Sequence, residues 1–387
     1  MENPFDRYAR YENLKVDLKK DGPRTKKVLK IIFSKFGDSK NKGVEGVIKT
    51  LVHALAEEEL SKKDKHFFQA LLYSKPELTN PHLIAGLRVS HKTLAGGIQR
   101  VNAITQLLER RQFGRNQRTS NNLIDALVNP HISERVERIL TSKYHANQQT
   151  SNNLIVALKD RLVADRIEKI LASKYHATQQ TSNNLIAALV NPQLSDSAQR
   201  ILASKYHATQ QTSNNLIAAL KDRKVGDKVE RILSSEHYAT QQTSNNLIAA
   251  LKENQKAERI ERILLSEHYV TQQNSINLIS ALKDQQVNEI IERILLSPQY
   301  QIRPVLDSLV DKLGSKDETF RNESLRILSR ISRTTEGSNV LKEILRDGQI
   351  SVLIGGNKRD YLLKPERRQA IEAILNENCK QINSKKT

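Results

Sequence analysis

The chain has 387 residues, and its 62 Lys and Arg against 43 Asp and Glu give a formal net charge of +19. Such an excess of positive charge favours polyanionic partners. The single cysteine, Cys379, excludes an intramolecular disulfide and a structural zinc site built on thiolates, and no apolar run reaches the roughly 18 residues of a membrane-spanning helix.

The N-terminal third is the most electropositive part of the chain. Residues 1–118 contain 24 basic and 13 acidic residues. Two stretches in this region, about 47–78 and 79–118, repeat the spacing of aliphatic residues found further along the chain. We therefore expect residues 1–118 to form a basic region that contains degenerate helical repeats.

A 31-residue period decides the architecture of residues 119–304. The string TSNNLI or a close variant begins at Thr119 and returns every 31 residues until Asn274, which gives six tandem units. Each unit has two segments with helical spacing of apolar residues, and Thr212 or Ser213 is the expected N-cap of the first helix of its unit. One helix pair cannot bury its apolar face alone, so the sequence predicts an all-α solenoid of two-helix repeats.

The remaining residues, 305–387, are expected to close this array. Leu309 and Leu313 keep the spacing of the repeats, which predicts one more degenerate unit. The last 50 residues are predicted to form a less regular helical cap. Atypical end units are typical of repeat proteins, because the ends must close the core against water.

The six units vary most between their two helices, after a recurring Ala-Leu. A changing loop on a constant scaffold is typical of a modular reader, although free drift of an exposed loop or duplication of a two-unit block explains the same variation. The candidate base-reading residues are Asn129, Pro130, Asp160, Arg161, Asn191, Pro192, Asp222, Arg223, Glu253, Asn254, Asp284 and Gln285.

Basic residues lie near these loops and at the start of several second helices, where free N–H groups attract anions. The candidate phosphate-binding residues are Arg135, Lys159, Arg166, Lys221, Lys228 and Arg259. Acidic neighbours such as Glu134 and Asp227 weaken this interpretation, since an acid–base pair also caps and solvates a helix.

This layout resembles the transcription activator-like effector family. TSNNLIAAL is similar to the first helix of that family's repeats, and Ala95-Gly96-Gly97-Ile98-Gln99-Arg100 resembles its glycine pair and the Gln that follows. The resemblance implies a right-handed superhelix around duplex DNA, one repeat per base pair, and an N-terminal region that grips phosphates. The six units are shorter than the family's repeats and lack the glycine pair, so a register shift of one residue in the reading pair stays open.

The residue types in the loops suit base recognition. Arg161 and Arg223 match guanine, Asn254 and Gln285 match adenine, and Pro130 and Pro192 match the thymine methyl group. Asp160 and Asp222 are expected to brace their loops instead, because Asp readily bonds the local backbone.

Two recurring motifs are interpreted as structural. The Asn pairs, such as Asn214-Asn215, are expected to bond across neighbouring units or to cap the first helix. The Tyr-His pairs, such as Tyr144-His145, are spread over different units, which predicts helix-end packing and not a metal cluster. We expect no metal, no cofactor and no catalytic site, and hence not an enzyme.

The leading hypothesis is sequence-selective binding of double-stranded DNA by a monomer, with no membrane and no small-molecule substrate involved. The expected location is intracellular, either a host nucleus after secretion or a bacterial nucleoid. Two alternatives stay open: a protein-binding scaffold of the HEAT or armadillo kind, and a single-stranded RNA reader that stacks bases on Tyr175, Tyr206 and Tyr238.

Overall fold

The computed structural model describes residues 83, 84, 87, 102, 104–109, 113, 116–354 and 357–384. The chain divides into two compact units, residues 1–201 and 202–387. The degenerate unit expected at 47–78 lies outside the described residues, as does most of the unit expected at 79–118. Of the latter, Ile104, Leu107 and Leu108 are described and buried.

Residues 116–304 form helix pairs at the 31-residue period. The first unit contains α9 (Gln117–Ala126), α10 (Ser133–Leu140), α11 (Gln148–Ala157), α12 (Ala164–Leu171), α13 (Gln179–Ala188) and α14 (Ser195–Leu202), the last residue of which belongs to the second unit. The second unit continues with α15 (Gln210–Ala219), α16 (Gly226–Leu233), the 3₁₀ turn η2 (Glu236–Tyr238), α17 (Gln241–Ala250), α18 (Asn254–Leu264), α19 (Gln272–Ala281) and α20 (Asn288–Leu295).

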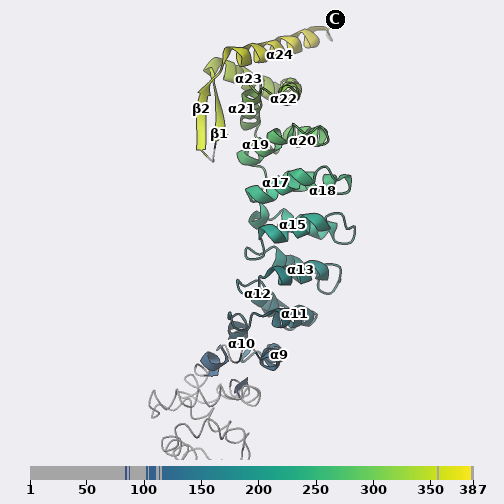
Figure 1. Ribbon diagram of the computed structural model, residues 1–387, viewed down its shortest axis with the longest axis vertical. Coiled ribbons are helices and arrows are strands. Elements are labelled where there is room, and N and C mark those ends of the chain that lie inside the picture. Colours follow the sequence, from purple (N-terminus) through teal and green to yellow (C-terminus); the bar gives the residue numbers. More distant parts are fainter. Residues whose placement is uncertain are drawn as a thin grey trace, which may run out of the picture. The chain divides into compact units, whose positions relative to one another are not determined.

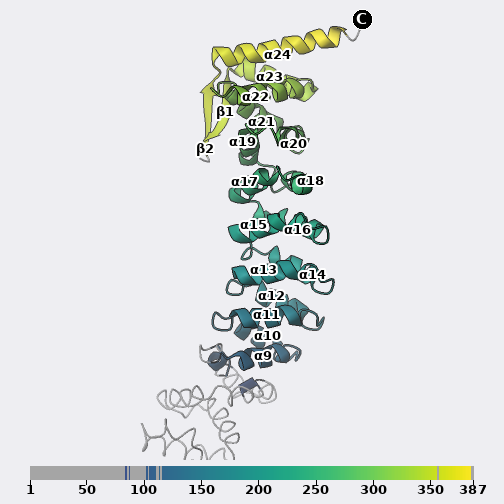
Figure 2. The same cartoon turned by 45° about the vertical axis from the view of Figure 1, so that its right-hand side comes forward.

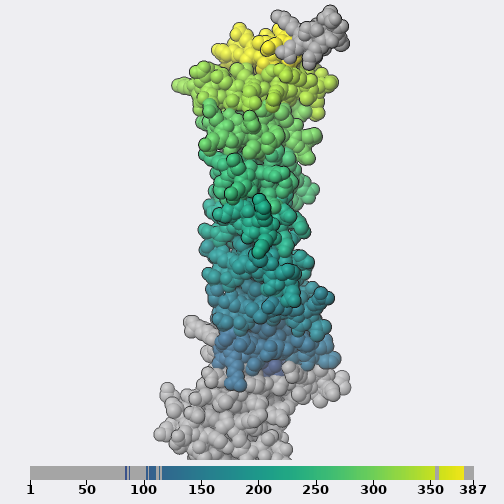
Figure 3. Space-filling view, turned by 90° about the vertical axis from the view of Figure 1, so that its right-hand side faces the viewer, coloured from purple at the N-terminus to yellow at the C-terminus, as the bar shows by residue number. Residues whose placement is uncertain are grey.

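Equivalent helices stack on one another within each unit. In the first unit α11 packs between α9 and α13; in the second, α15, α17 and α19 pack in succession beside the row α16, α18 and α20 (Figures 1 and 2). The recurring Leu of each first helix, such as Leu154 or Leu247, is fully buried. Side chains close the spaces between successive helix pairs (Figure 3). The fold is the predicted all-α solenoid.

The first helix of each repeat begins earlier than predicted. Helix α15 begins at Gln210, and the side chain of Thr209 accepts the backbone N–H of Thr212 at 3.2 Å. Thr212 itself is buried in the first turn. The expectation that Thr212 or Ser213 is the N-cap is therefore wrong. The cap lies three residues upstream, where a side-chain oxygen meets the free N–H groups of the first turn.

Within each unit, buried His and Tyr side chains at one position of the repeat bond a repeat to the one before it, and together they are called the column here. The column recurs every 31 residues and comprises His145, His176, His207, Tyr238, Tyr269 and Tyr300, each at most 2% exposed. His176 Nε2 lies 2.9 Å from the carbonyl oxygen of Leu140, the last residue of α10. Tyr269 donates its hydroxyl to the carbonyl of Leu233, the last residue of α16, at 3.0 Å. The column thus caps helix ends whose carbonyls have no partner within their own helix.

The C-terminal part of the second unit is not purely helical. It contains α21 (Ile302–Lys312), α22 (Glu318–Ile331), α23 (Thr335–Asp347), the antiparallel strands β1 (Gln349–Ile354) and β2 (Asn357–Leu362), and α24 (Pro365–Ser384). Strand β1 packs against α21 and α19, so the hairpin lies beside the last first-type helices (Figures 1 and 2). The helical cap predicted for these residues is wrong at 349–362, because Ile350 and Val352 alternate with polar residues and are buried on one face.

Candidate functional site

Five of the six inter-helix loops share one local geometry. In each, the first residue of the candidate pair turns its side-chain oxygen back onto the backbone N–H two residues later. These residues are Asn129, Asp160, Asn191, Asp222 and Asp284, at distances of 2.8–3.1 Å. This Asx turn fixes the loop backbone. Asp160 and Asp222 have the bracing geometry expected from the sequence.

The second residue of each braced pair is exposed. Pro130 and Arg161 project from loops of the first unit, as does Pro192. Arg223 and Gln285 occupy the same position in the second unit. Among the residues that the structure describes, the side chains of Arg161, Arg223 and Gln285 make no hydrogen bond or ion pair. A braced loop therefore presents one uncommitted side chain per repeat.

The fifth repeat departs from this pattern. Its pair, Glu253 and Asn254, forms no Asx turn, and Asn254 is already the first residue of α18. Glu253 is not one of the Asn or Asp residues that form Asx turns, and this repeat also has Lys256, 6% exposed, at a position where the other repeats bury an aliphatic residue such as Val225. Lys256 donates to the Glu253 carboxylate at 2.8 Å, so Glu253 serves this buried ammonium instead of the loop.

The candidate phosphate-binding residues divide into paired and uncommitted groups. Arg166 forms an ion pair with Glu137 at 3.2 Å. Arg259 contacts Asp227 and lies 3.5 Å from Glu230, and this guanidinium lowers the pKa of Asp227. Among the described residues, Arg135 contacts the carbonyl of His131, at 3.5 Å, and no carboxylate; Lys228 is half-buried.

The two loop lysines of this set are placed differently. Lys159 and Lys221 are exposed and, within the described part of the chain, form no ion pair. Both directly precede a braced pair. Among the described residues, the exposed cations of the set without an ion pair are therefore these two loop lysines, while half-buried Arg135 at the start of α10 also has no carboxylate partner.

Other basic residues are engaged in ion pairs between successive second helices. Arg200 donates to Glu168 at 2.5 Å, and Arg262 donates to Glu230 at 2.7 Å. Arg293 and Glu261 continue the series at 2.7 Å. These pairs join residues 32 positions apart and offset part of the positive charge along the second helices.

The first helices carry a polar series of their own. Asn153 donates its amide to Asn121 at 2.6 Å, and Asn246 donates to Asn214 at the same distance. A Gln one turn earlier, such as Gln149, donates to the Asn of its own helix. The expectation that the Asn pairs bond across neighbouring repeats is confirmed, and their amides are largely used within the protein.

Three apolar residues on the loops were not identified from the sequence. Val128 and Val190 are 48% and 49% exposed, and Leu162 is 78% exposed. All three lie beside braced pairs of the first unit. Their signal in the sequence is an aliphatic residue within an otherwise polar break between two helices.

The tyrosines considered for base stacking do not share one surface. Tyr175 and Tyr206 are 46% and 41% exposed, whereas Tyr238 is fully buried in the His and Tyr column. Tyr238 belongs to the next position of the repeat, because the order Tyr-His becomes His-Tyr in the later repeats. The row of Tyr175, Tyr206 and Tyr238 is therefore not a continuous platform.

The described residues contain neither a candidate metal site nor a candidate membrane-spanning helix. No group of three or more His, Cys, Asp or Glu among them is arranged to hold a metal ion. No described helix is long and apolar enough to cross a bilayer.

Comparisons with known proteins do not identify a family for this chain. No protein family matches the chain, and no curated protein matches it. Among solved structures, it is similar to an engineered protein at 13% identity and a TM-score of 0.30, over 98% of this chain and 96% of that chain. It is also similar, at 13% identity and a TM-score of 0.27 over 96% of both chains, to a chain from work on a phosphorylation switch that controls the interaction between cadherin and β-catenin. By its own helices the chain is an all-α repeat protein, and its resemblance to transcription activator-like effectors stays a prediction.

Proposed function

We propose that the protein binds double-stranded DNA and selects its sequence through the braced inter-helix loops. The observation that carries this proposal is the Asx turn repeated in five loops, which holds one residue of each variable pair and leaves the other exposed. A reader needs this division, because a base contact is specific only if the backbone behind it is fixed.

Exposed basic residues on the same inter-helix loops also support DNA binding there. Lys159 and Arg161 lie together on one loop, and Lys221, Arg223 and Lys224 on another; all five are exposed. Lysines here contribute sequence-independent attraction to phosphates, whereas an Arg fork recognises guanine O6 and N7. Exposed Val128 and Val190 add apolar surface of the kind that contacts a thymine methyl group.

A protein-binding scaffold is the second candidate. The observation that favours it is the exposure of Leu162, Val128 and Val190, since exposed apolar residues in one region are typical of protein interfaces. Such a scaffold would bind DNA only through its charge, without preference for sequence.

Selection of bound duplexes from a random DNA pool at about 150 mM salt separates these functions, because exposed charges more than about 8 Å apart are then largely screened. We expect enrichment of a defined motif. Arg161→Gln should relax the preference at one position of the motif and cost about 1–3 kcal/mol in discrimination.

The matched control is Lys169→Gln, which removes one positive charge from the second helix of the same repeat. It should weaken binding of all sequences alike and leave the motif unchanged. If the wild-type protein enriches no motif, the reader function is wrong. If Lys169→Gln alters the motif as much as Arg161→Gln does, the loops are not the reading surface.

A further inference from the structure

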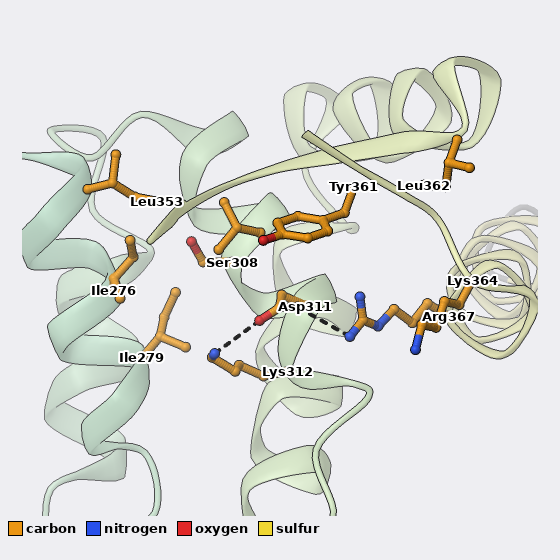
Figure 4. A pocket seen from close by; sticks show the side chains of 11 residues that line it. Ile276, Ile279, Ser308, Asp311, Lys312, Leu353, Tyr361, Leu362, Lys364 and Arg367 are labelled. Carbon is orange, nitrogen blue, oxygen red and sulfur yellow. Dashed lines mark hydrogen bonds and ion pairs between the residues drawn. The ribbon is translucent and has the colours of Figure 1, made fainter. Parts of the chain in front are cut away.

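A pocket of about 380 Å³ lies in the second unit, where the hairpin meets α19, α21 and the start of α24 (Figure 4). Ile276 and Ile279 line it from α19, Leu353 from β1, and Tyr361 and Leu362 from β2. One side of the pocket is therefore apolar. Its volume is within the range of small-molecule sites.

The pocket lies where other residues replace the recurring Asn residues of the first helices. Counting by 31 residues, Ile276 occupies the position of the acceptor Asn214, and Ser308 occupies the position of the donor Asn246. Ser308 is 2% exposed, and its hydroxyl has no hydrogen-bond partner among the described residues. Ile276 offers it no oxygen, and a serine side chain is smaller than the asparagine found at this position in the other repeats.

The opposite side of the pocket is cationic. Lys312, Lys364 and Arg367 line it together with a single carboxylate, that of Asp311. Asp311 is already paired, at 3.0 Å with Lys312 and 3.2 Å with Arg367 (Figure 4). The Nε of Arg367 is buried and has no partner within the described part of the chain, and the exposed Lys364 has no ion pair there. The Ser308 hydroxyl, the Nε–H of Arg367 and the ammonium group of Lys364 thus have no acceptor or ion-pair partner among the described residues.

We propose that this pocket binds a small anion with an apolar body, in which a carboxylate or phosphate monoester meets the donors. The anionic group would accept from Arg367 and Lys364, and the body would pack between Ile276 and Tyr361. The Ser308 hydroxyl supplies a further hydrogen bond. An unsatisfied buried donor costs free energy until an acceptor arrives, so the ligand gains affinity from groups that the protein leaves unpaired. The sequence predicts no small-molecule substrate, and the proposed ligand departs from that prediction. Its pocket is separate from the loops proposed to bind DNA.

The test is isothermal titration of the full chain with phenylacetate and with phenyl phosphate. Acetate, inorganic phosphate and benzylamine serve as probes that lack the apolar body or the negative charge. We expect at least one of the first two to bind and the last three to bind far more weakly. The tighter of phenylacetate and phenyl phosphate identifies the anionic group.

Two variants locate the binding. Ser308→Ala and Lys364→Gln should each weaken the tighter probe about tenfold, as expected for a hydrogen bond to a charged group. Ser308→Ala should not lower the melting temperature, because its hydroxyl bonds nothing in the free protein. Lys342→Gln, an exposed lysine on α23, is the matched control and should bind normally. The proposal is overturned if neither amphipathic anion binds, if acetate or phosphate binds equally well, or if both pocket variants bind like the wild type.

Discussion

Replacing Tyr269 with phenylalanine removes one oxygen from the buried His and Tyr column and nothing else. The hydroxyl donates to two backbone carbonyls, those of Leu233 and Tyr238, both at 3.0 Å. The carbonyl of Tyr238 keeps the N–H of Thr240 at 2.7 Å as a partner. The carbonyl of Leu233, at the end of α16, has no other donor among the described residues.

The expected cost follows from this difference. Loss of one hydrogen bond to an acceptor that keeps another partner costs about 0.5–1.5 kcal/mol, and a buried carbonyl left unsatisfied costs about 1–3 kcal/mol. One hydroxyl group serves both carbonyls, so these two costs overlap in part and do not add in full. We expect the free energy of unfolding to fall by about 2 kcal/mol in total. Phenylalanine fills nearly the same space, so a cavity adds little.

Urea unfolding followed by far-UV circular dichroism measures the loss, and amide hydrogen exchange should place it in α16 and α18. The matched control is Tyr206→Phe, since Tyr206 is 41% exposed and its change should stay within about 0.5 kcal/mol. Equal midpoints for Tyr269→Phe and the wild type would refute the capping role of the column.

Further predictions address the column, the loops and the fifth repeat. Burial lowers the pKa of His145, with an opposing effect from its bond to the Leu108 carbonyl; its contribution to stability is therefore present above about pH 6.5 and lost as the pH falls below that value. His145→Tyr, which installs the residue of the later repeats, should reduce the drop in urea midpoint between pH 7 and pH 5, and an unchanged drop would contradict this. Burial raises the pKa of Tyr269, so the same reasoning predicts loss of stability above about pH 10, smaller in Tyr269→Phe. Asp160→Ala should cost about 1 kcal/mol of stability and blur the DNA motif at one position, while the salt dependence of binding stays unchanged; a lost motif position without any loss of stability would argue against bracing. Lys256→Val should raise the free energy of unfolding by about 1 kcal/mol, and the urea midpoint with it, because an apolar residue replaces a buried ammonium whose partner Glu253 is exposed; a lower midpoint would show that the Glu253 pair is stabilising.

The repeat architecture could be predicted from the sequence because the 31-residue period is visible in it. Leu and Ile recur at constant spacing in six units, and both helices of each unit follow from that spacing. The N-cap was misplaced by three residues, since Thr209 and Thr212 are equally good capping residues and only the structure shows which of them is buried.

Contacts between distant residues were harder to predict. The bond from Tyr269 to Leu233 spans 36 residues, and no local pattern reveals it. The hairpin did leave a signal, the alternation of Ile350 and Val352 before Gly355-Gly356, but it is short. The pocket depends on Ser308 and Ile276, whose meaning emerges only when α19 and α21 are seen to pack together.

The regular spacing of the inter-repeat bonds has a consequence for how such a protein changes over generations. The Asn, Arg–Glu and Tyr contacts join residues 32, 32, and 31 or 36 positions apart. Unequal recombination that adds or deletes one whole 31-residue unit within the array would therefore leave the Asn and Tyr bonds with an equivalent partner, whereas the Arg–Glu series is interrupted at Gln199. Point changes at the exposed loop position would disturb none of them. The length of the array and the identity of its loop residues can thus diverge independently of the scaffold.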